Sequence, residues 1–86
     1  MRLVKDIPHE KYKIQIFNYN SKYIVKIELD QFEQSYKIGE SDVAGLDEVE
    51  NMITKSLLSN VLKRFIDMKT DWYEAFKMKN TNENEL

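Results

Sequence analysis

Few residues of this 86-residue chain are suited to catalysis. His9 is the only histidine, it follows Pro8, and the chain has no cysteine. The phosphate-binding glycine loops and the nucleophile and zinc motifs of common enzyme families are absent, and two glycines are too few to surround a phosphate. We therefore expect a structural, solvent-exposed His9, no metal or cofactor, no small-molecule substrate and no enzymatic activity.

Acidic residues are densest in residues 40–54, which contain five carboxylates and no base. Asp47 and Glu50 have the spacing of a helix capping box, and acids in a first helical turn stabilise a helix by about 0.3–1 kcal/mol each. The spacing of a calcium-binding loop is absent. The segment therefore indicates the start of a helix and not a metal site.

Lysine and tyrosine are interleaved in the first half of the chain, a composition that can bind nucleic acid by stacking and charge. The pairs are Lys11-Tyr12-Lys13, Lys22-Tyr23 and Tyr36-Lys37. Strand alternation places these tyrosines with the aliphatic residues on a covered face, while the outward lysines alternate with Glu and Gln. The formal net charge is −2. We therefore do not expect nucleic-acid binding.

The hydrophobic period changes from two to three-to-four across Gly39 and Gly45, which predicts strands followed by helix. Alternation predicts three antiparallel strands, at about 12–19, 22–29 and 32–38. A loop at Asn20-Ser21 would oppose Ile16 to Val25. The third strand has two possible registers, one opposing Glu28 to Glu33 and one opposing Lys26 to Glu33. Residues 1–10 stay unassigned, as an edge strand or an arm.

Helical spacing predicts a long helix from Leu46 to Met68, a break near Met68–Thr70, and a short second helix over residues 72–79. The expected fold is α+β and two-layered, a three-stranded antiparallel sheet (β-β-β) covered by the long helix and the short second helix. Residues 1–79 would form a single α+β domain, and residues 80–86 a disordered acidic tail.

The second half of the long helix carries more apolar surface than one sheet face can cover. Leu58, Leu62, Phe65 and Ile66 need another cover, which could be the short helix folded back or a partner, either a second copy or a different protein. Trp72, Tyr73 and Phe76 form an aromatic cluster that could complete the core. Alternatively, it could bind a partner, because Trp and Tyr dominate binding hot spots.

These residues favour a small non-enzymatic protein–protein interaction module that binds or occludes another protein. The element order is similar to that of some small phage-encoded inhibitors, including inhibitors of RNA-guided nucleases, although no residue pattern is shared. The alternatives are a homodimeric accessory factor that contacts nucleic acid, or a structural subunit of a larger assembly. No apolar run approaches the roughly 20 residues of a membrane span, so we expect no membrane contact and a cytoplasmic protein.

Overall fold

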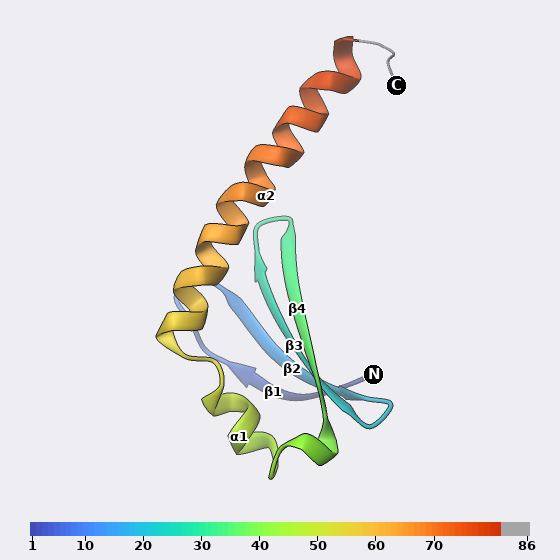
Figure 1. The fold of residues 1–86 in the computed structure, drawn as a ribbon, viewed down its shortest axis with the longest axis vertical. Helices are drawn as coiled ribbons and strands as arrows, with labels where there is room; N and C mark the ends of the chain where they lie inside the picture. The colour runs from blue at the N-terminus through green and yellow to red at the C-terminus, as the bar shows by residue number, and fades with distance from the viewer. Residues whose placement is uncertain (82–86) are drawn as a thin grey trace.

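The computed structural model describes residues 1–81 and contains one antiparallel sheet and two α-helices (Figure 1). The strands occur in the sheet in chain order: β1 (Arg2–Ile7), β2 (Lys13–Tyr19), β3 (Lys22–Leu29) and β4 (Phe32–Gly39). A short 3₁₀ helix (Glu40–Asp42) leads to α1 (Leu46–Asn51) and α2 (Lys55–Thr81). The predicted α+β class is confirmed, with an antiparallel sheet and a long C-terminal helix.

The prediction of three strands is wrong, because the unassigned residues at the start of the chain form β1. Its pairing with β2 sets Ile7 against Ile14 and shifts register between Leu3 and Lys5. This bulge lets Val4 and Ile7 both pack on the core although they are three residues apart. The bulge interrupts the alternation of inward and outward side chains along β1. The apolar residues of this strand therefore do not follow a period of two, and their spacing did not predict a strand. The order also differs from β-β-β-α-α, on which the similarity to phage inhibitors depends.

The hairpin between β2 and β3 has the predicted register, with Ile16 opposite Val25. Its two loop residues, Asn20 and Ser21, have positive φ angles of 56° and 62°, as the type I′ turn of a tight hairpin requires. The backbone twist of that turn matches the twist of the strands. Local turn chemistry and the core pattern therefore specify the same pairing.

The first of the two registers considered for β4 is observed, with Glu28 opposite Glu33. Each carboxylate has a lysine nearby: Glu28 lies 4.0 Å from Lys13, and Glu33 lies 3.9 Å from Lys26. These exposed pairs offset the repulsion of like charges placed directly across two strands. The turn leaves Asp30 with a φ of 56°.

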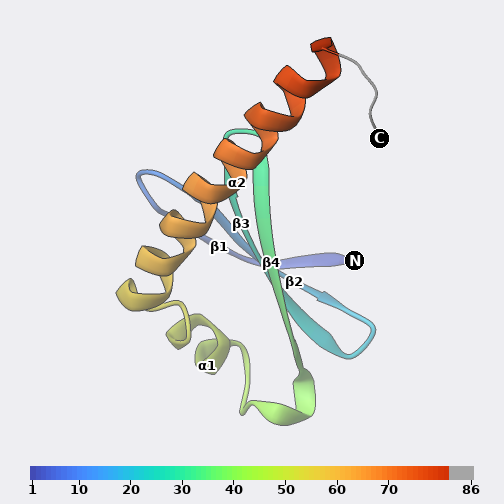
Figure 2. The same ribbon diagram turned by 45° about the horizontal axis from the view of Figure 1, so that its top comes forward.

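The core lies between one face of the sheet and the two helices (Figure 2). Ile14, Ile16 and Ile27 of the sheet are fully buried, as are Val49 of α1 and Val61 of α2. The molecule is thus two-layered around a small aliphatic core. On the opposite face Ile24 is buried between its cross-strand neighbours Phe17 and Lys37, and the Lys26 ammonium lies 5.2 Å from the Phe17 ring centre.

The helical region breaks at a different place from the one predicted. The chain leaves helix after Asn51 and re-enters at Lys55, where the Thr54 hydroxyl caps α2 by accepting a hydrogen bond of 3.1 Å from the Leu57 amide. Through Met68–Thr70 the helix is unbroken, so the predicted short helix over 72–79 is the last part of α2. The Thr70 hydroxyl donates to the Ile66 carbonyl one turn back, at 3.0 Å, within the continuous helix.

The unbroken helix makes the molecule long. At 1.5 Å per residue α2 spans about 40 Å, whereas an eight-residue strand spans about 26 Å. The molecule measures 51 × 28 × 18 Å, and its radius of gyration is 16.3 Å, against about 12 Å for a compact chain of this length. Met68 is the last residue of α2 that packs on the core. We call residues 69–81 the overhang; they extend past the β3–β4 turn in Figure 1.

Residues 80 and 81 of the predicted tail continue α2, and residues 82–86 lie outside the described residues. The single-domain boundary at residue 79 stays a prediction. Within residues 1–81, no helix combines the length and apolar character that a bilayer crossing requires.

Candidate functional site

A polar network fixes α2 on β4 and so sets the direction of the overhang. The side chain of Gln34, 9% exposed, donates to the Val61 carbonyl at 2.9 Å. Its oxygen accepts from the Tyr36 hydroxyl at 2.7 Å and from Arg64 Nε at 3.0 Å, and Arg64 Nη2 donates to the Tyr36 hydroxyl at 2.9 Å. Burying an amide side chain without hydrogen-bond partners would destabilise the folded state. This closed network, which pairs both polar atoms of the Gln34 amide, therefore favours one placement of the helix.

The predicted partner-binding residues of the long helix have different environments. Phe65 is 2% exposed and lies against Tyr12, with ring centres 6.0 Å apart. Leu58 and Leu62 are half-buried and pack on the same core. Ile66 is 57% exposed. The sheet therefore covers Phe65, covers the two leucines in part, and leaves Ile66 to solvent.

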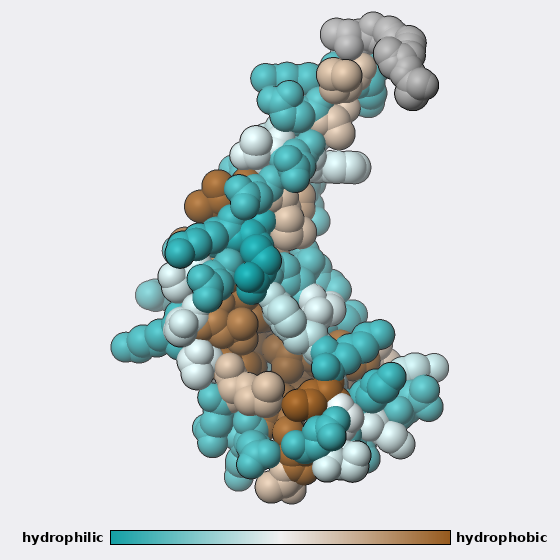
Figure 3. All heavy atoms as spheres, viewed as in Figure 1, coloured by the Kyte–Doolittle hydropathy of each residue, from teal (hydrophilic) through white to brown (hydrophobic). Residues whose placement is uncertain are grey.

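The aromatic cluster lies on the overhang, beyond the sheet. Trp72, Tyr73 and Phe76 are 58%, 51% and 54% exposed. The predicted alternative, in which a second helix folds back and buries Trp72 and Phe76 in the core, does not occur because α2 continues without a break. Figure 3 shows the corresponding part of the molecule as a narrow projection on which apolar and hydrophilic side chains alternate.

The exposed aromatic residues continue the core-facing side of α2. At 100° per residue, Trp72 and Phe76 lie within about 20° of the direction of Phe65, and Tyr73 lies about 80° from it. On the overhang this side has no sheet beneath it. We call these three aromatic residues, Trp72, Tyr73 and Phe76, together with the exposed Ile66 one turn before the overhang, the overhang face.

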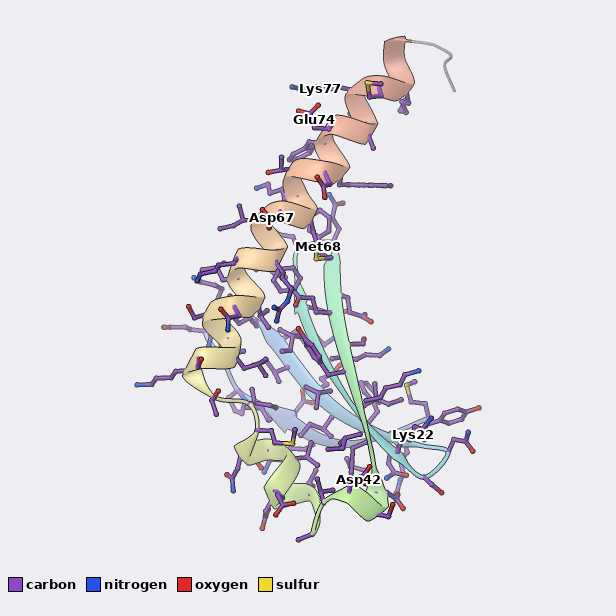
Figure 4. The ribbon with its side chains drawn as sticks, in the orientation of Figure 1. Lys22, Asp42, Asp67, Met68, Glu74 and Lys77 are labelled. Atoms are coloured by element: carbon purple, nitrogen blue, oxygen red, sulfur yellow. The ribbon has the colours of Figure 1, made fainter. Side chains whose placement is uncertain are left out.

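Charged side chains divide between the two sides of the overhang. The Lys69 ammonium is 5.9 Å from the Tyr73 ring centre, and that of Lys79 is 5.0 Å from the Phe76 ring centre. Glu74 projects from the side of α2 away from the sheet, while Met68 lies on the sheet side (Figure 4). Two rings of the overhang face thus have a lysine ammonium within cation–π distance, while Glu74 lies behind that face.

A shallow groove of about 540 Å³ lies where α2 leaves the sheet, lined by Gln31, Phe32, Met68, Asp71 and Trp72. A second groove of about 430 Å³ adjoins it along β4 and shares Met68 and Asp71. Trp72 therefore forms one wall of a depression at the base of the overhang. Such a depression is where a partner's side chain could insert.

A separate cleft of about 320 Å³ lies between β4 and the start of α2, lined by Val25, Tyr36, Lys37, Ile38, Val49, Met52, Ile53 and Leu57. Its walls are nearly all apolar. Binding sites for small molecules usually add several convergent polar groups to such a lining, and Lys37 is the only charged one here. The cleft therefore gives no indication of a substrate.

The residues that the sequence offered for chemistry have structural roles. His9 is exposed; its Nδ1 accepts hydrogen bonds from the amides of Lys11 and Tyr12, at 3.0 and 3.2 Å, and its ring stacks on Tyr12 at 5.0 Å. The acidic segment opens a helix as expected, with Asp47 and Glu48 in the first turn of α1, but the capping box of Asp47 with Glu50 does not form. The carboxylate that bonds to the backbone there is that of Glu48, which accepts from the Ala44 amide at 3.0 Å. Glu50 instead lies 3.8 Å from Lys5.

Across residues 1–81 no cluster of three or more His, Cys, Asp or Glu side chains is arranged to bind a metal ion. Sequence reasoning missed Gln34 with its partners Tyr36 and Arg64, and it missed Lys69. The signal for Gln34 was present, since it is a polar residue among the inward-facing positions of β4. Lys69 could not be recognised, because the expected break at Met68–Thr70 separated it from the aromatic cluster.

Comparison with protein-family models, with curated proteins and with solved structures found no match to this chain.

Proposed function

We propose that this protein is a non-enzymatic protein–protein interaction module that binds or occludes another protein chain, either a second copy or a different protein, through the overhang face. The observation that supports it is the exposure of three neighbouring aromatic side chains, Trp72, Tyr73 and Phe76, on a helix that projects past its own sheet. The half-buried Leu58 and Leu62 lie at the base of this surface.

The size of the surface supports this proposal. An aromatic side chain buries about 150–250 Å² when it is fully covered, so three that are half exposed leave roughly 300 Å² of ring surface in water. Ile66 adds to this area. Contiguous apolar patches of about 300–600 Å² on small proteins are often functional. Covering such a patch with a partner removes that area from water.

The rigidity of the surface also supports it. A free peptide with these residues would lose conformational entropy on becoming helical, whereas here the helix is already formed and anchored by Gln34 and Arg64. Binding by an ordered surface avoids that cost. A phage-type inhibitor would be one form of such a module, and a structural subunit of a larger assembly would use the same face.

A photo-crosslinking experiment tests the proposal. A photoreactive amino acid at position 76, expressed in the native host, should form a covalent adduct with a protein that mass spectrometry can identify, and that protein is then purified for binding measurements. Trp72→Ala should weaken binding by at least about thirtyfold, the effect of a hot-spot residue, without changing the thermal midpoint by more than a few degrees.

Glu74→Ala is the matched control, because Glu74 lies on the same helical turns but on the side away from the sheet. It should bind like the parent protein. Unfolding of Trp72→Ala would show that the cluster is part of the core. Unchanged binding by that variant would remove the overhang face from the contact.

A further inference from the structure

We infer that the partner of the overhang face is a second copy of this chain, packed antiparallel along α2. The inference rests on the proposed function, since it takes the overhang to be a protein-binding surface. It identifies the occupant and the orientation, neither of which follows from exposure alone.

The first argument is a heptad pattern along the exposed side of α2. Leu62, Ile66, Lys69, Tyr73 and Phe76 follow one another at intervals of four, three, four and three residues. This spacing has the 3.5-residue period of a seam along which two helices pack side by side. The seam is continuous only because α2 runs unbroken through residues 68–70. The partner that it fits is therefore another long helix, and a second copy carries one with the same seam.

The second argument is that the seam is accessible. Val61 and Phe65 face the sheet, whereas the average direction of the seam is rotated around the helix by about 100° from Val61 and about 60° from Phe65. Ile66, Tyr73 and Phe76 are each more than half exposed. A second helix can thus lie along α2 without displacing the sheet.

The third argument concerns Lys69, the only charged residue of the seam, and it decides the orientation. A parallel pair in register would set Lys69 against Lys69, two like charges at a contact that excludes water. An antiparallel pair with its two-fold axis level with residue 71 sets Lys69 against the second copy's Tyr73, and Ile66 against the second copy's Phe76. Each layer then occurs twice, as two-fold symmetry requires.

The Lys69–Tyr73 layer is chemically favourable. Within one chain the Lys69 ammonium already lies 5.9 Å from the Tyr73 ring centre, inside the range of cation–π attraction. In the antiparallel pair the same lysine would meet the equivalent ring of the other copy. The one polar residue of the seam thus has a partner there, and it specifies orientation as polar seam residues do in coiled coils.

The area is sufficient for a weak dimer. Ile66, Trp72, Tyr73 and Phe76, each about half exposed, present on the order of 400 Å² per copy. A standard interface buries about 800 Å² per partner, of which about 65% is apolar in homodimers, or roughly 500 Å². The apolar area of the overhang face is thus somewhat smaller than that of a standard homodimer interface. We expect a dissociation constant on the order of 10 µM.

The charges beside the seam give the dimer a distinguishing salt dependence. Lys63 and Lys77 each follow a seam residue by one position, so they border the seam on one side and approach each other across the antiparallel pair. Glu74 projects from the side of α2 away from the sheet (Figure 4). Salt screens the repulsion between the lysines, so self-association should strengthen as ionic strength rises. Binding of an acidic partner to the same lysines would weaken instead.

Sedimentation equilibrium over about 5 to 300 µM tests the inference, since this range brackets the expected dissociation constant. The parent protein should pass from monomer to dimer, and raised salt should favour the dimer. Phe76→Glu should raise the dissociation constant of the dimer at least a hundredfold. Its helical circular dichroism signal should be unchanged, because Phe76 lies outside the core. The control Glu74→Lys, on the side of α2 away from the sheet, should leave the dissociation constant nearly unchanged. A monomeric parent protein at the highest concentration, or a Phe76→Glu variant that still dimerises, overturns the inference.

Disulfide crosslinking tests the orientation, and the absence of cysteine from the chain makes each new thiol specific. A mixture of Lys69→Cys and Tyr73→Cys should form the mixed disulfide on mild oxidation. Lys69→Cys alone should not crosslink, and if it does, the helices are parallel and the orientation is wrong. A parent protein that is monomeric but is photo-crosslinked through position 76 to a different protein would leave the proposed function standing and contradict only the second copy. If the parent protein neither self-associates nor is photo-crosslinked to another protein, both the second copy and the proposed function are contradicted.

Discussion

At the scale of single residues, Gln34 has the largest effect on where the candidate surface lies. It connects β4 to α2 by accepting from Tyr36 and Arg64 and donating to the Val61 carbonyl. The Val61 carbonyl belongs to the helix backbone, so its position depends on the helix as a whole. Any rotation of α2 about its axis would break the network and move the overhang face.

We predict that Gln34→Ala lowers the free energy of unfolding by about 1–3 kcal/mol, because it leaves the Tyr36 hydroxyl and the Arg64 guanidinium without their shared acceptor. Urea denaturation followed by circular dichroism measures this. Ser35→Ala is the control, because Ser35 is the exposed neighbour whose hydroxyl bonds only to Glu33 among the described residues; it should change the stability by less than about 0.5 kcal/mol. Equal stability of the two variants would mean that the network contributes nothing net.

At the scale of elements, the position of the helix break decides how much of α2 is exposed. Met52–Thr54 separates α1 from α2, and the two helices then pack Val49 and Val61 on the sheet separately. The local reason is the Thr54 side chain, which gives α2 an N-cap where the sequence pattern had suggested an uninterrupted helix. Around Thr70 the chain stays helical, and α2 therefore continues past the end of the sheet.

Thr54→Ala should therefore destabilise the protein by about 1 kcal/mol, the usual effect of losing an N-cap side chain. Thr70→Ala removes a hydroxyl of the same type from the interior of α2 and should be neutral or slightly stabilising, because alanine has the higher helix propensity. Thermal melts of the two variants measure the difference. A larger loss at position 70 than at position 54 would mean that the hydroxyl bond to Ile66 supports the helix and that the cap does not.

At the scale of the whole molecule, a small two-layer domain ends in a helix, α2, that projects beyond its sheet. The radius of gyration of 16.3 Å reflects the overhang and not a loosely packed core. Folding of the domain and display of the overhang face are thus separable, because the core residues end at Met68 and the exposed aromatic residues begin at Trp72.

A chain ending at Lys69 should consequently fold with a cooperative thermal transition within about 5 °C of the parent protein, since no buried apolar side chain is removed. It should be monomeric at concentrations where the parent self-associates. Calorimetry and sedimentation of the shortened chain measure these two properties. If the shortened chain is unfolded, residues 70–81 contribute to the core in solution and the domain and the overhang are not independent.

The sequence by itself determined the elements whose signals are local. Strict alternation and a two-residue turn specified the β2–β3 hairpin, and the apolar spacing after Gly45 specified helix. For these elements, every residue that carries the signal is a near neighbour in the chain. Part of the candidate surface was predictable for the same reason, since Trp72, Tyr73 and Phe76 are recognisable as a cluster from spacing alone.

Only the tertiary structure decided which apolar residues the chain covers by itself. Phe65 and Ile66 are adjacent and similar in hydrophobicity, yet Phe65 is buried against Tyr12 while Ile66 is exposed, because the rotation of α2 is set by Gln34 more than twenty residues away in sequence. β1 needed its bulge against β2 to bury Val4 and Ile7 together. Whether a residue is buried depends on which distant segments of the chain pack against it. The hydropathy pattern along the sequence gives only the tendency of each residue to be buried.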